Sequence, residues 1–369
     1  MRVVLTGEVP SQLEQCLQLV QGFGLECAAG DCVTFSNLAY RLAKAPATDL
    51  VLVLAGADDD KTQAAVRYAA AHAGSPVLAA GPTTDVRAGP EAVRSGARQY
   101  LDHGKLKEEL TGALDLLFQE GTVKGRRGQT FAVTAAAPGH GVTTAATGLA
   151  FALGAGNPGQ VLLAEVGNGI PELALDLDVR HPVGDVVRDW QRSDARLVRE
   201  ALVAHPAGVS VLAHAAEALS PVVMAPDVMR HLVVLFRTMF DEVVLDLGHG
   251  GYGAGLEAMK LAEAVLVLVR LDVPGLRMAR RYLRLLVEEG LDGGKLRVVA
   301  SRYGQSGQLD WRKAEEALGS KVLEWLPEDP ASVNLALNRG RPLVQAARRA
   351  KLTRAFDKLA NHLAAKPAG

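Results

Sequence analysis

The chain has 369 residues, of which 49% are hydrophobic and 22% are charged, so it is long and apolar enough for two globular domains and is not a largely disordered protein. Its 40 Lys and Arg residues nearly balance its 41 Asp and Glu residues, and the net charge of −1 excludes a protein that holds nucleic acid by overall charge alone. The sequence lacks an uncharged apolar run that could span a membrane, and its start turns polar too soon for a signal peptide, so we expect a cytoplasmic protein.

Strand and helix patterns alternate through residues 1–119, which we predict to form one domain. Continuous apolar runs bounded by polar residues are typical of strands that are buried on both faces. The predicted strands are 2–6, 25–28, 49–54, 76–80 and 97–101. The predicted helices are 11–22, 35–45, 62–73, 90–95 and 105–118. Five such β/α units predict a doubly wound α/β domain with a parallel sheet.

This pattern, which ends in GARQYL at 96–101, resembles a response-regulator receiver domain, which has a flavodoxin-like fold. The residues that a receiver needs are missing, because Leu54 stands where the phosphoacceptor Asp belongs and residues 5–7 contain no acidic pair. We interpret the acidic run 58–60, just downstream, as a solvated turn. The resemblance therefore implies a pseudo-receiver that serves docking or dimer contacts.

A Gly-rich basic segment at 120–129 (EGTVKGRRGQ) interrupts the alternation, and we interpret it as a linker. A second alternating region, 130–369, follows. Its predicted strands are 131–135, 161–166, 209–213, 242–247, 265–270, 297–300 and 321–326. Its predicted helices are 143–153, 184–191, 194–202, 226–239, 255–262, 273–289, 311–318 and 332–338. This region is therefore predicted to be a second doubly wound parallel-sheet domain.

The stretch 130–144, TFAVTAAAPGHGVTT, combines a strand, a Gly-rich turn and a helix start, as a phosphate-binding P-loop requires. Gly139 and Gly141 let backbone N–H groups approach a phosphate, and the helix dipole favours an anion. Thr143 stands where a P-loop hydroxyl would hold Mg²⁺, with Thr144 beside it.

This stretch resembles the deviant Walker motif of the MinD/ParA family, Lys-Gly-Gly-x-Gly-Lys-Thr-Thr. Matching positions are Gly139, Gly141, Thr143 and Thr144, and His140 fills the variable position as an exposed, mostly neutral loop histidine. Ala137 and Val142 take the places of the two lysines. The resemblance implies that these lysines neutralise phosphate and stabilise the transition state, so their loss predicts weak ATP binding and no hydrolysis.

Two further motifs of the MinD/ParA family can be located. The strand 161–167 matches one that ends in Asp-x-Asp in the family, but here the pair is Glu165 and Gly167, and the second carboxylate is absent. The strand 240–246 resembles a Walker B strand, and it implies that Asp246 stands behind the Mg²⁺.

Segments 172–178, 184–187, 205–213, 301–304, 325–329 and 338–343 resemble the TadZ/CpaE branch of this family. That branch also carries a receiver-like domain before its ATPase-like domain. The resemblance implies a dimeric, non-hydrolysing scaffold at a cell pole or the inner face of the membrane. Its implied role is the localisation and assembly of a Tad (Flp) type pilus or secretion system, with proteins of that machine as partners.

The candidate site is accordingly a nucleotide site without a catalytic residue. Its predicted cofactor-binding residues are Gly139, His140, Gly141, Val142, Thr143, Thr144 and Asp246. Thr143 and Asp246 are the predicted Mg²⁺ residues if a nucleotide binds, and the cofactor is either ATP with Mg²⁺ or none. We predict no specific nucleic-acid partner. A basic arc on helix 273–289 is interpreted as a solvated or partner-facing surface.

Helix 352–363 is amphipathic, and it is either a packing helix or a peripheral membrane contact. Two other functions stay open. A slow MinD/ParA-type ATPase that positions a cargo would need a lysine from elsewhere, such as Lys260 or Lys295. A regulatory module would instead sense a different ligand in the second domain.

Overall fold

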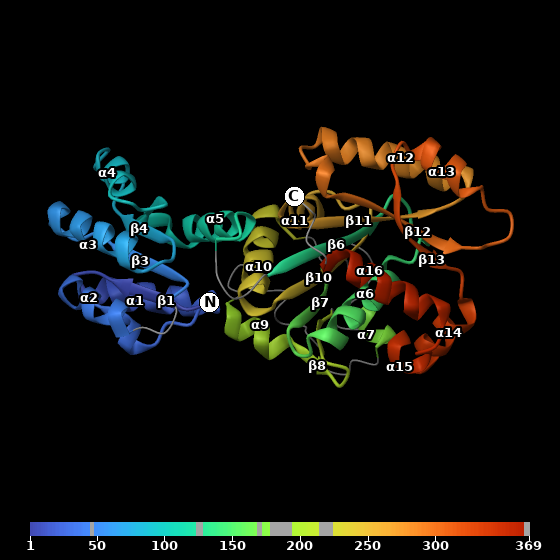
Figure 1. The fold of residues 1–369 in the computed structure, drawn as a ribbon, viewed down its shortest axis with the longest axis horizontal. Coiled ribbons are helices and arrows are strands. Elements are labelled where there is room, and N and C mark those ends of the chain that lie inside the picture. The colour runs from blue at the N-terminus through green and yellow to red at the C-terminus, as the bar shows by residue number, and fades with distance from the viewer. Residues whose placement is uncertain (45–47, 123–127, 168–171, 178–193, 214–223, 365–369) are drawn as a thin grey trace. The chain divides into compact units, whose positions relative to one another are not determined.

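The computed structural model describes residues 1–44, 48–122, 128–167, 172–177, 194–213 and 224–364 (Figure 1). The chain divides into two compact units, residues 1–128 with 194–196, and residues 129–193 with 197–369. The predicted helix 184–191 and the basic core of the predicted linker, 123–127, lie outside the described residues.

The first unit contains a five-stranded parallel sheet in the order β2-β1-β3-β4-β5. Its strands are β1 (Val3–Thr6), β2 (Cys32–Val33), β3 (Leu50–Leu54), β4 (Val77–Gly81) and β5 (Gln99–Asp102). The connecting helices are α1 (Pro10–Gly22), α2 (Phe35–Lys44), α3 (Asp59–His72), α4 (Ala88–Arg94) and α5 (Leu106–Gln119). This strand order is the flavodoxin-like one, and the predicted doubly wound class is confirmed.

The predicted strand at 25–28 is wrong. Glu26 forms only an isolated bridge with Arg2, and the strand beside β1 is β2, which begins six residues later. A short turn, Ala29–Asp31, separates them, and it forms because the Asp31 carboxylate accepts the N–H of Ala28 at 3.2 Å. The buried Asp31 also pairs with Arg2 and Arg41, so a polar contact decides where the strand starts.

The acidic run at 58–60 begins a helix. Asp58 is the N-cap of α3, where its carboxylate accepts the Lys61 N–H at 3.1 Å, and Asp59 and Asp60 lie in the first turn. Acidic side chains are stabilising at this end of a helix. The run 58–60, which we interpreted as a solvated turn, therefore stabilises the start of α3. Leu54, at the end of β3, is buried.

The second unit contains an eight-stranded sheet in the order β13-β12-β11-β6-β10-β7-β9-β8. Its strands are β6 (Gln129–Ala135), β7 (Val161–Glu165), β8 (Val203–His205), β9 (Val209–Leu212), β10 (Glu242–His249), β11 (Ala264–Arg270), β12 (Leu296–Tyr303) and β13 (Val322–Pro327). All neighbours are parallel except the edge pair β8 and β9. The short strand β8 was not predicted; it joins β9 through a turn in which Gly208 has a φ of 85°.

Helices cover both faces of this sheet (Figure 1). The helices α6 and α16 pack on one face, whereas α10, α11 and α12 contact strands from the other. The helices that the structure describes in this unit are α6 (Val142–Gly156), α7 (Leu173–Asp176), α9 (Ala195–Ala201), α10 (Pro226–Met239), α11 (Ala254–Leu261), α12 (Val273–Glu288), α13 (Trp311–Leu318), α14 (Pro330–Asn338), α15 (Leu343–Ala346) and α16 (Lys351–Ala364).

The apolar side of α16 is part of the core of the second unit. Leu352, Phe356 and Leu359 are buried there against α6 and the sheet. That face is therefore already covered and is not available to insert into a membrane. Within the described ranges, none of the helices is both long and apolar enough to span a bilayer.

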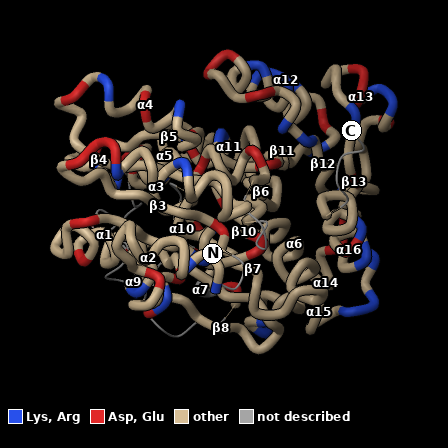
Figure 2. Tube along the Cα trace, turned by 60° about the vertical axis from the view of Figure 1, so that its left-hand side comes forward, with Lys and Arg blue, Asp and Glu red and all other residues tan. Residues whose placement is uncertain are grey.

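Charge is unevenly distributed over the second unit. Figure 2 shows Lys and Arg along α12 and α16, whereas the described strands β6, β7 and β10 carry only the acidic residues Glu165, Glu242 and Asp246. The four arginines of the predicted arc on α12, at 277, 280, 281 and 284, are all exposed. Val287, placed in the apolar stripe of that helix, is 49% exposed, and Tyr282 is buried instead.

The contact between α6 and α16 requires a glycine at position 148, because a larger side chain would not fit there. A Cβ on Gly148 would lie closer than 3.0 Å to the ring of Phe356, which is 2% exposed. Gly148→Ala is therefore expected to lower the free energy of unfolding by about 1–3 kcal/mol, although Ala is the better helix former. Chemical denaturation measures this. Gly156→Ala in the same helix is the control, because nothing lies within 4 Å of a Cβ there; equal effects would contradict the assignment.

Candidate functional site

The loop 136–141 connects β6 to α6 at the carboxyl edge of the sheet. Gly139 and Gly141 have φ values of 77° and 80°, a left-handed conformation that glycine adopts at little cost. Gly141 is also the N-cap of α6, no side chain caps this end, and the first turn contains no acidic residue. The loop and the N-terminus of a 15-residue helix together offer backbone N–H groups and a positive dipole end to an anion.

His140 is not an exposed loop residue. Its side chain is 5% exposed, and Nδ1 lies 3.1 Å from the backbone oxygen of Leu268, at the end of β11. Because a carbonyl can only accept, Nδ1 carries the proton that is donated. Burial lowers the pKa of the imidazole, with the charges of Arg270 and Arg302 acting in the same direction, and these effects outweigh the opposite ones of the Leu268 carbonyl and Asp272. The ring is therefore neutral near pH 7 and brings no charge to the loop.

Val142 belongs to the hydrophobic core. It is 8% exposed and packs in the same cluster as Ala145 and Leu149 of α6. The position that resembles the P-loop lysine thus contributes packing and no cation.

Asp246 lies within β10, and its carboxyl is close enough to Thr143 for the two side chains to interact. Its Oδ1 accepts the N–H of Gly248 at 3.0 Å, whereas Oδ2 is buried and lacks a hydrogen-bond partner within the described ranges. Burial raises the pKa of this carboxyl to about 6, and the Thr143 hydroxyl and the Gly248 N–H act in the opposite direction. The structure therefore brings the predicted pair Thr143 and Asp246 together, with one carboxylate oxygen unused.

Glu165 stands beside Asp246 in the β7–β10 register, but its carboxylate is engaged elsewhere. Its Oε1 accepts the N–H groups of Glu172 and Leu173, at 2.8 and 3.1 Å, at the start of α7. A Cβ on Gly167 would lie 2.8 Å from the carbonyl carbon and oxygen of Leu247. Position 167, where the MinD/ParA motif Asp-x-Asp has its second Asp, therefore cannot hold a side chain unless the backbone moves.

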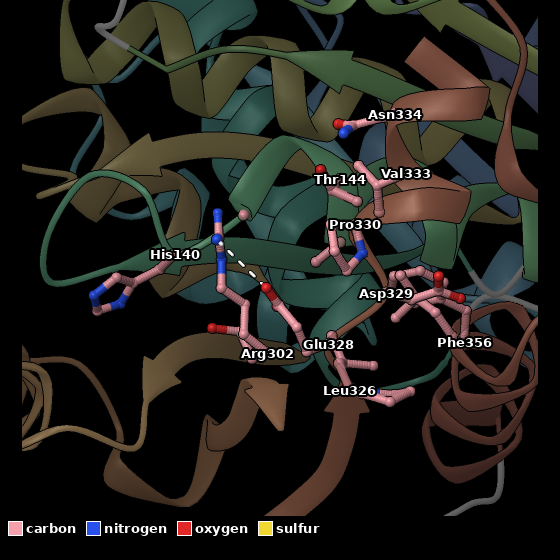
Figure 3. Close-up of a pocket in the computed structure, with 15 residues that line it drawn as sticks. His140, Thr144, Arg302, Leu326, Glu328, Asp329, Pro330, Val333, Asn334 and Phe356 are labelled. Carbon is pink, nitrogen blue, oxygen red and sulfur yellow. Dashed lines mark ion pairs between the residues drawn. The ribbon is translucent and has the colours of Figure 1, made fainter. Parts of the chain in front are cut away.

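A cavity of about 180 Å³ opens beside the loop, which contributes His140, Gly141 and Thr144 to its wall (Figure 3). Its apolar residues include Leu326, Val333, Leu352 and Phe356. Its polar residues include Arg302, Glu328, Asp329 and Asn334. This cavity was not predicted from the sequence, although the family-like segments 301–304 and 325–329 lie at the carboxyl ends of the neighbouring parallel strands β12 and β13.

Lys260 and Lys295, which we considered as replacements for the P-loop lysine, lie at the amino-terminal end of the parallel strands. Lys295 immediately precedes β12 and donates from Nζ to the backbone oxygen of Lys260 at 2.7 Å. Because β12 runs parallel to the central strands, its start is remote from the loop that follows β6. Neither lysine can replace the missing P-loop cation within one chain.

No protein-family model and no curated protein matches this chain. Solved structures do resemble it. A ParA family ATPase from Chlorobium tepidum TLS is 18% identical, covering 63% of this chain and 99% of its own, with a TM-score of 0.57. MinD from Pyrococcus horikoshii OT3, complexed with Mg-ADP, is 21% identical over 64% and 96%, with a TM-score of 0.54. A chain of the MinC:MinD cell division complex of Aquifex aeolicus is 20% identical over 64% and 95%, with a TM-score of 0.52.

These similarities concern the fold. The first unit is too short to supply the matched share, so the match includes the second unit. The predicted MinD/ParA-like P-loop fold is therefore confirmed, and one protein with this fold, MinD from Pyrococcus horikoshii OT3, is complexed with Mg-ADP.

The buried carboxylate makes a testable contribution to stability. Because the pKa of Asp246 rises from 3.8 to about 6 on folding, the folded state holds the proton more tightly, and stability is lost as the pH rises through this window. Asp246→Asn is expected to remove the loss of about 2 kcal/mol that this carboxyl causes between pH 4 and pH 7. Denaturant unfolding across this range measures it. Asp357→Asn, on the exposed side of α16, is the control, and parallel pH profiles for wild type and Asp246→Asn would contradict the burial argument.

Proposed function

We propose that this chain is a non-hydrolysing, weakly nucleotide-binding positioning protein that acts as a homodimeric scaffold. The observation that carries the proposal is the combination of an intact anion-binding loop with neutral residues at both lysine positions. The loop keeps its two left-handed glycines and the uncapped start of α6, while Val142 is buried in the core. Such a site can bind a phosphate through backbone donors but lacks the charges that stabilise a transition state.

The residues around the loop fit a nucleotide with Mg²⁺. Asp246 has a buried carboxylate oxygen that no described group satisfies, and the Thr143 hydroxyl lies beside this carboxyl. A carboxylate and a hydroxyl are suitable partners for a hydrated Mg²⁺. When bound, the metal would neutralise phosphate charge. Thr143 and Asp246 would position it, and Gly139, Gly141 and Thr144 would hold the phosphates.

The neighbouring cavity suits a base. Its volume of about 180 Å³ is below the roughly 300–1,000 Å³ of a site for a complete small molecule. It is apolar on the side of Leu326 and Phe356 and polar at Asp329 and Asn334. A planar base in the cavity would leave its phosphates on the loop, which is the arrangement that we propose for ATP.

The absence of hydrolysis follows from two positions. Val142 offers no cation to the phosphates, and Gly167, against the backbone of Leu247, leaves no room for a carboxylate that could orient water. The chain would then use nucleotide as a stable ligand, in contrast to an ATPase that cycles.

The cellular role that we propose is the localisation and assembly of a Tad (Flp) type pilus or secretion system, at the inner face of the membrane or a cell pole. Its support is the TadZ/CpaE-like sequence pattern together with a flavodoxin-like first unit that has Leu54 at the phosphoacceptor position. Partners would be a second copy and proteins of that machine. A MinD/ParA-type protein that positions another cargo fits the fold equally well.

Calorimetric titration with MgATP tests the binding half of this proposal. Loss of one charge-assisted contact weakens binding about 10- to 100-fold, so we expect a Kd in the micromolar to submillimolar range. Gly141→Ala/Thr143→Ala is expected to abolish it, because Ala at a φ of 80° is strained and the hydroxyl is removed. Titration heats that are absent up to millimolar ATP, or unchanged in the variant, would overturn the proposal.

Restoring a lysine separates binding from hydrolysis. Val142→Lys is expected to tighten MgATP binding about 10-fold, because its ammonium would reach the phosphates, yet to release no phosphate, because Gly167 still lacks a carboxylate. Phosphate release and calorimetry measure the two effects. Val142→Leu is the control for the disturbed core, and steady phosphate release by Val142→Lys would show that the second carboxylate is dispensable.

A further inference from the structure

We propose that Arg302 is the phosphate-binding cation of this site, in place of the missing P-loop lysine, and that its ligand is the phosphate chain of a nucleoside di- or triphosphate. This inference rests on the proposed nucleotide binding and adds to it the residue that recognises charge. A residue in this role must be a cation whose side chain faces the loop 136–141, keeps N–H donors for a ligand and is held in position. Arg302 meets each requirement.

Arg302 has an unusual backbone. It lies near the end of β12 with a φ of 53°, and among the residues that the structure describes it alone combines a positive φ with a side chain larger than hydrogen. That conformation is unfavourable for a residue with a Cβ, and such backbone strain is concentrated at ligand sites.

The Arg302 side chain faces the loop. It shares one cavity with His140, Gly141 and Thr144, and Figure 3 shows it rising between His140 and Thr144. Its charge is close enough to His140 to lower the pKa of that buried imidazole. A guanidinium here adjoins the loop whose backbone would hold phosphate.

The Arg302 guanidinium keeps N–H donors that could bind a ligand. Its Nη1 lies 3.9 Å from Oε1 of Glu328, too far for a hydrogen bond, and the two side chains are 45% and 25% exposed. A guanidinium carries five N–H donors in a planar fork that matches phosphate geometry. The pair with Glu328 therefore orients Arg302 without occupying it, and a phosphate would compete with the Glu328 carboxylate.

Of the other basic groups near the loop, His140 and Arg270 are unsuitable, and Arg341 lines a separate cavity together with Thr144. His140 is neutral and donates to a backbone carbonyl. Arg270, the second arginine near His140, pairs with Asp272 at 3.3 Å and donates to Gln305 at 3.2 Å. Arg302 is therefore the basic residue of the described cavity wall that remains able to bind an anion.

Calorimetry with ATP, ADP and adenosine, each with Mg²⁺, tests the assignment on the full chain. In the wild type we expect affinity to fall from ATP to ADP to adenosine. Arg302→Gln is expected to weaken ATP binding about 10- to 100-fold and to leave adenosine binding within about 2-fold. Arg302→Lys should recover part of the ATP affinity. Glu328→Gln, which removes the competing carboxylate, should tighten ATP binding severalfold.

Arg349→Gln, an exposed arginine outside the cavity, is the matched control, and thermal unfolding shows that each variant is folded. Equal losses for ATP and adenosine in Arg302→Gln would overturn the assignment and place Arg302 at the base instead. Unchanged ATP binding in that variant would also overturn it, while the proposed function would stand. A wild type that binds none of the three ligands overturns both.

Discussion

The uncapped start of α6 is the feature on which the site depends. Its backbone N–H groups and dipole face the loop 136–141, and neither an N-cap side chain nor an acidic residue of the first turn receives them. The strand β6, between β10 and β11, holds this helix end at the carboxyl edge of the sheet. The arrangement suits the anion that we propose as its ligand, and the residues around the loop differ in how much negative charge they could balance.

In the function that we propose, that balance favours retention of a bound nucleotide over its hydrolysis. In the first turn of α6 a buried valine replaces the cation, and beyond β7 a glycine packed on Leu247 replaces a carboxylate. Each change removes a group that acts on developing charge, while the backbone donors, which also bind the ground state, remain. Asp246 stays buried with one free oxygen, and this cost to the apoprotein is reasonable if a metal or its water is the intended partner.

The sequence was most informative where a local pattern decides the structure. Apolar runs such as 49–54 and 265–270 gave strands because central parallel strands are buried on both faces. Gly139 and Gly141 gave the loop because the left-handed turn needs glycine. The strand predicted at 25–28 is wrong because the buried contacts of Asp31 place the strand at Cys32–Val33. The strand β8 was not predicted because its three residues are too few to show an apolar pattern.

Contacts between distant segments could not be predicted from spacing. His140 is buried because the end of β11 offers the Leu268 carbonyl, and Glu165 is turned aside by the start of α7. The cavity is assembled from the ends of β12 and β13, α14 and α16, which meet only in the folded sheet. The charge of Arg302 becomes relevant to the loop for the same reason.

The central claim is that the chain holds ATP without cleaving it. The most direct measurement incubates the full chain with saturating MgATP for a day, measures bound nucleotide by equilibrium dialysis, and quantifies ATP and ADP in the mixture by anion-exchange chromatography. The account predicts ATP bound at equilibrium and ADP no higher than in buffer. ADP that accumulates with protein concentration would contradict it.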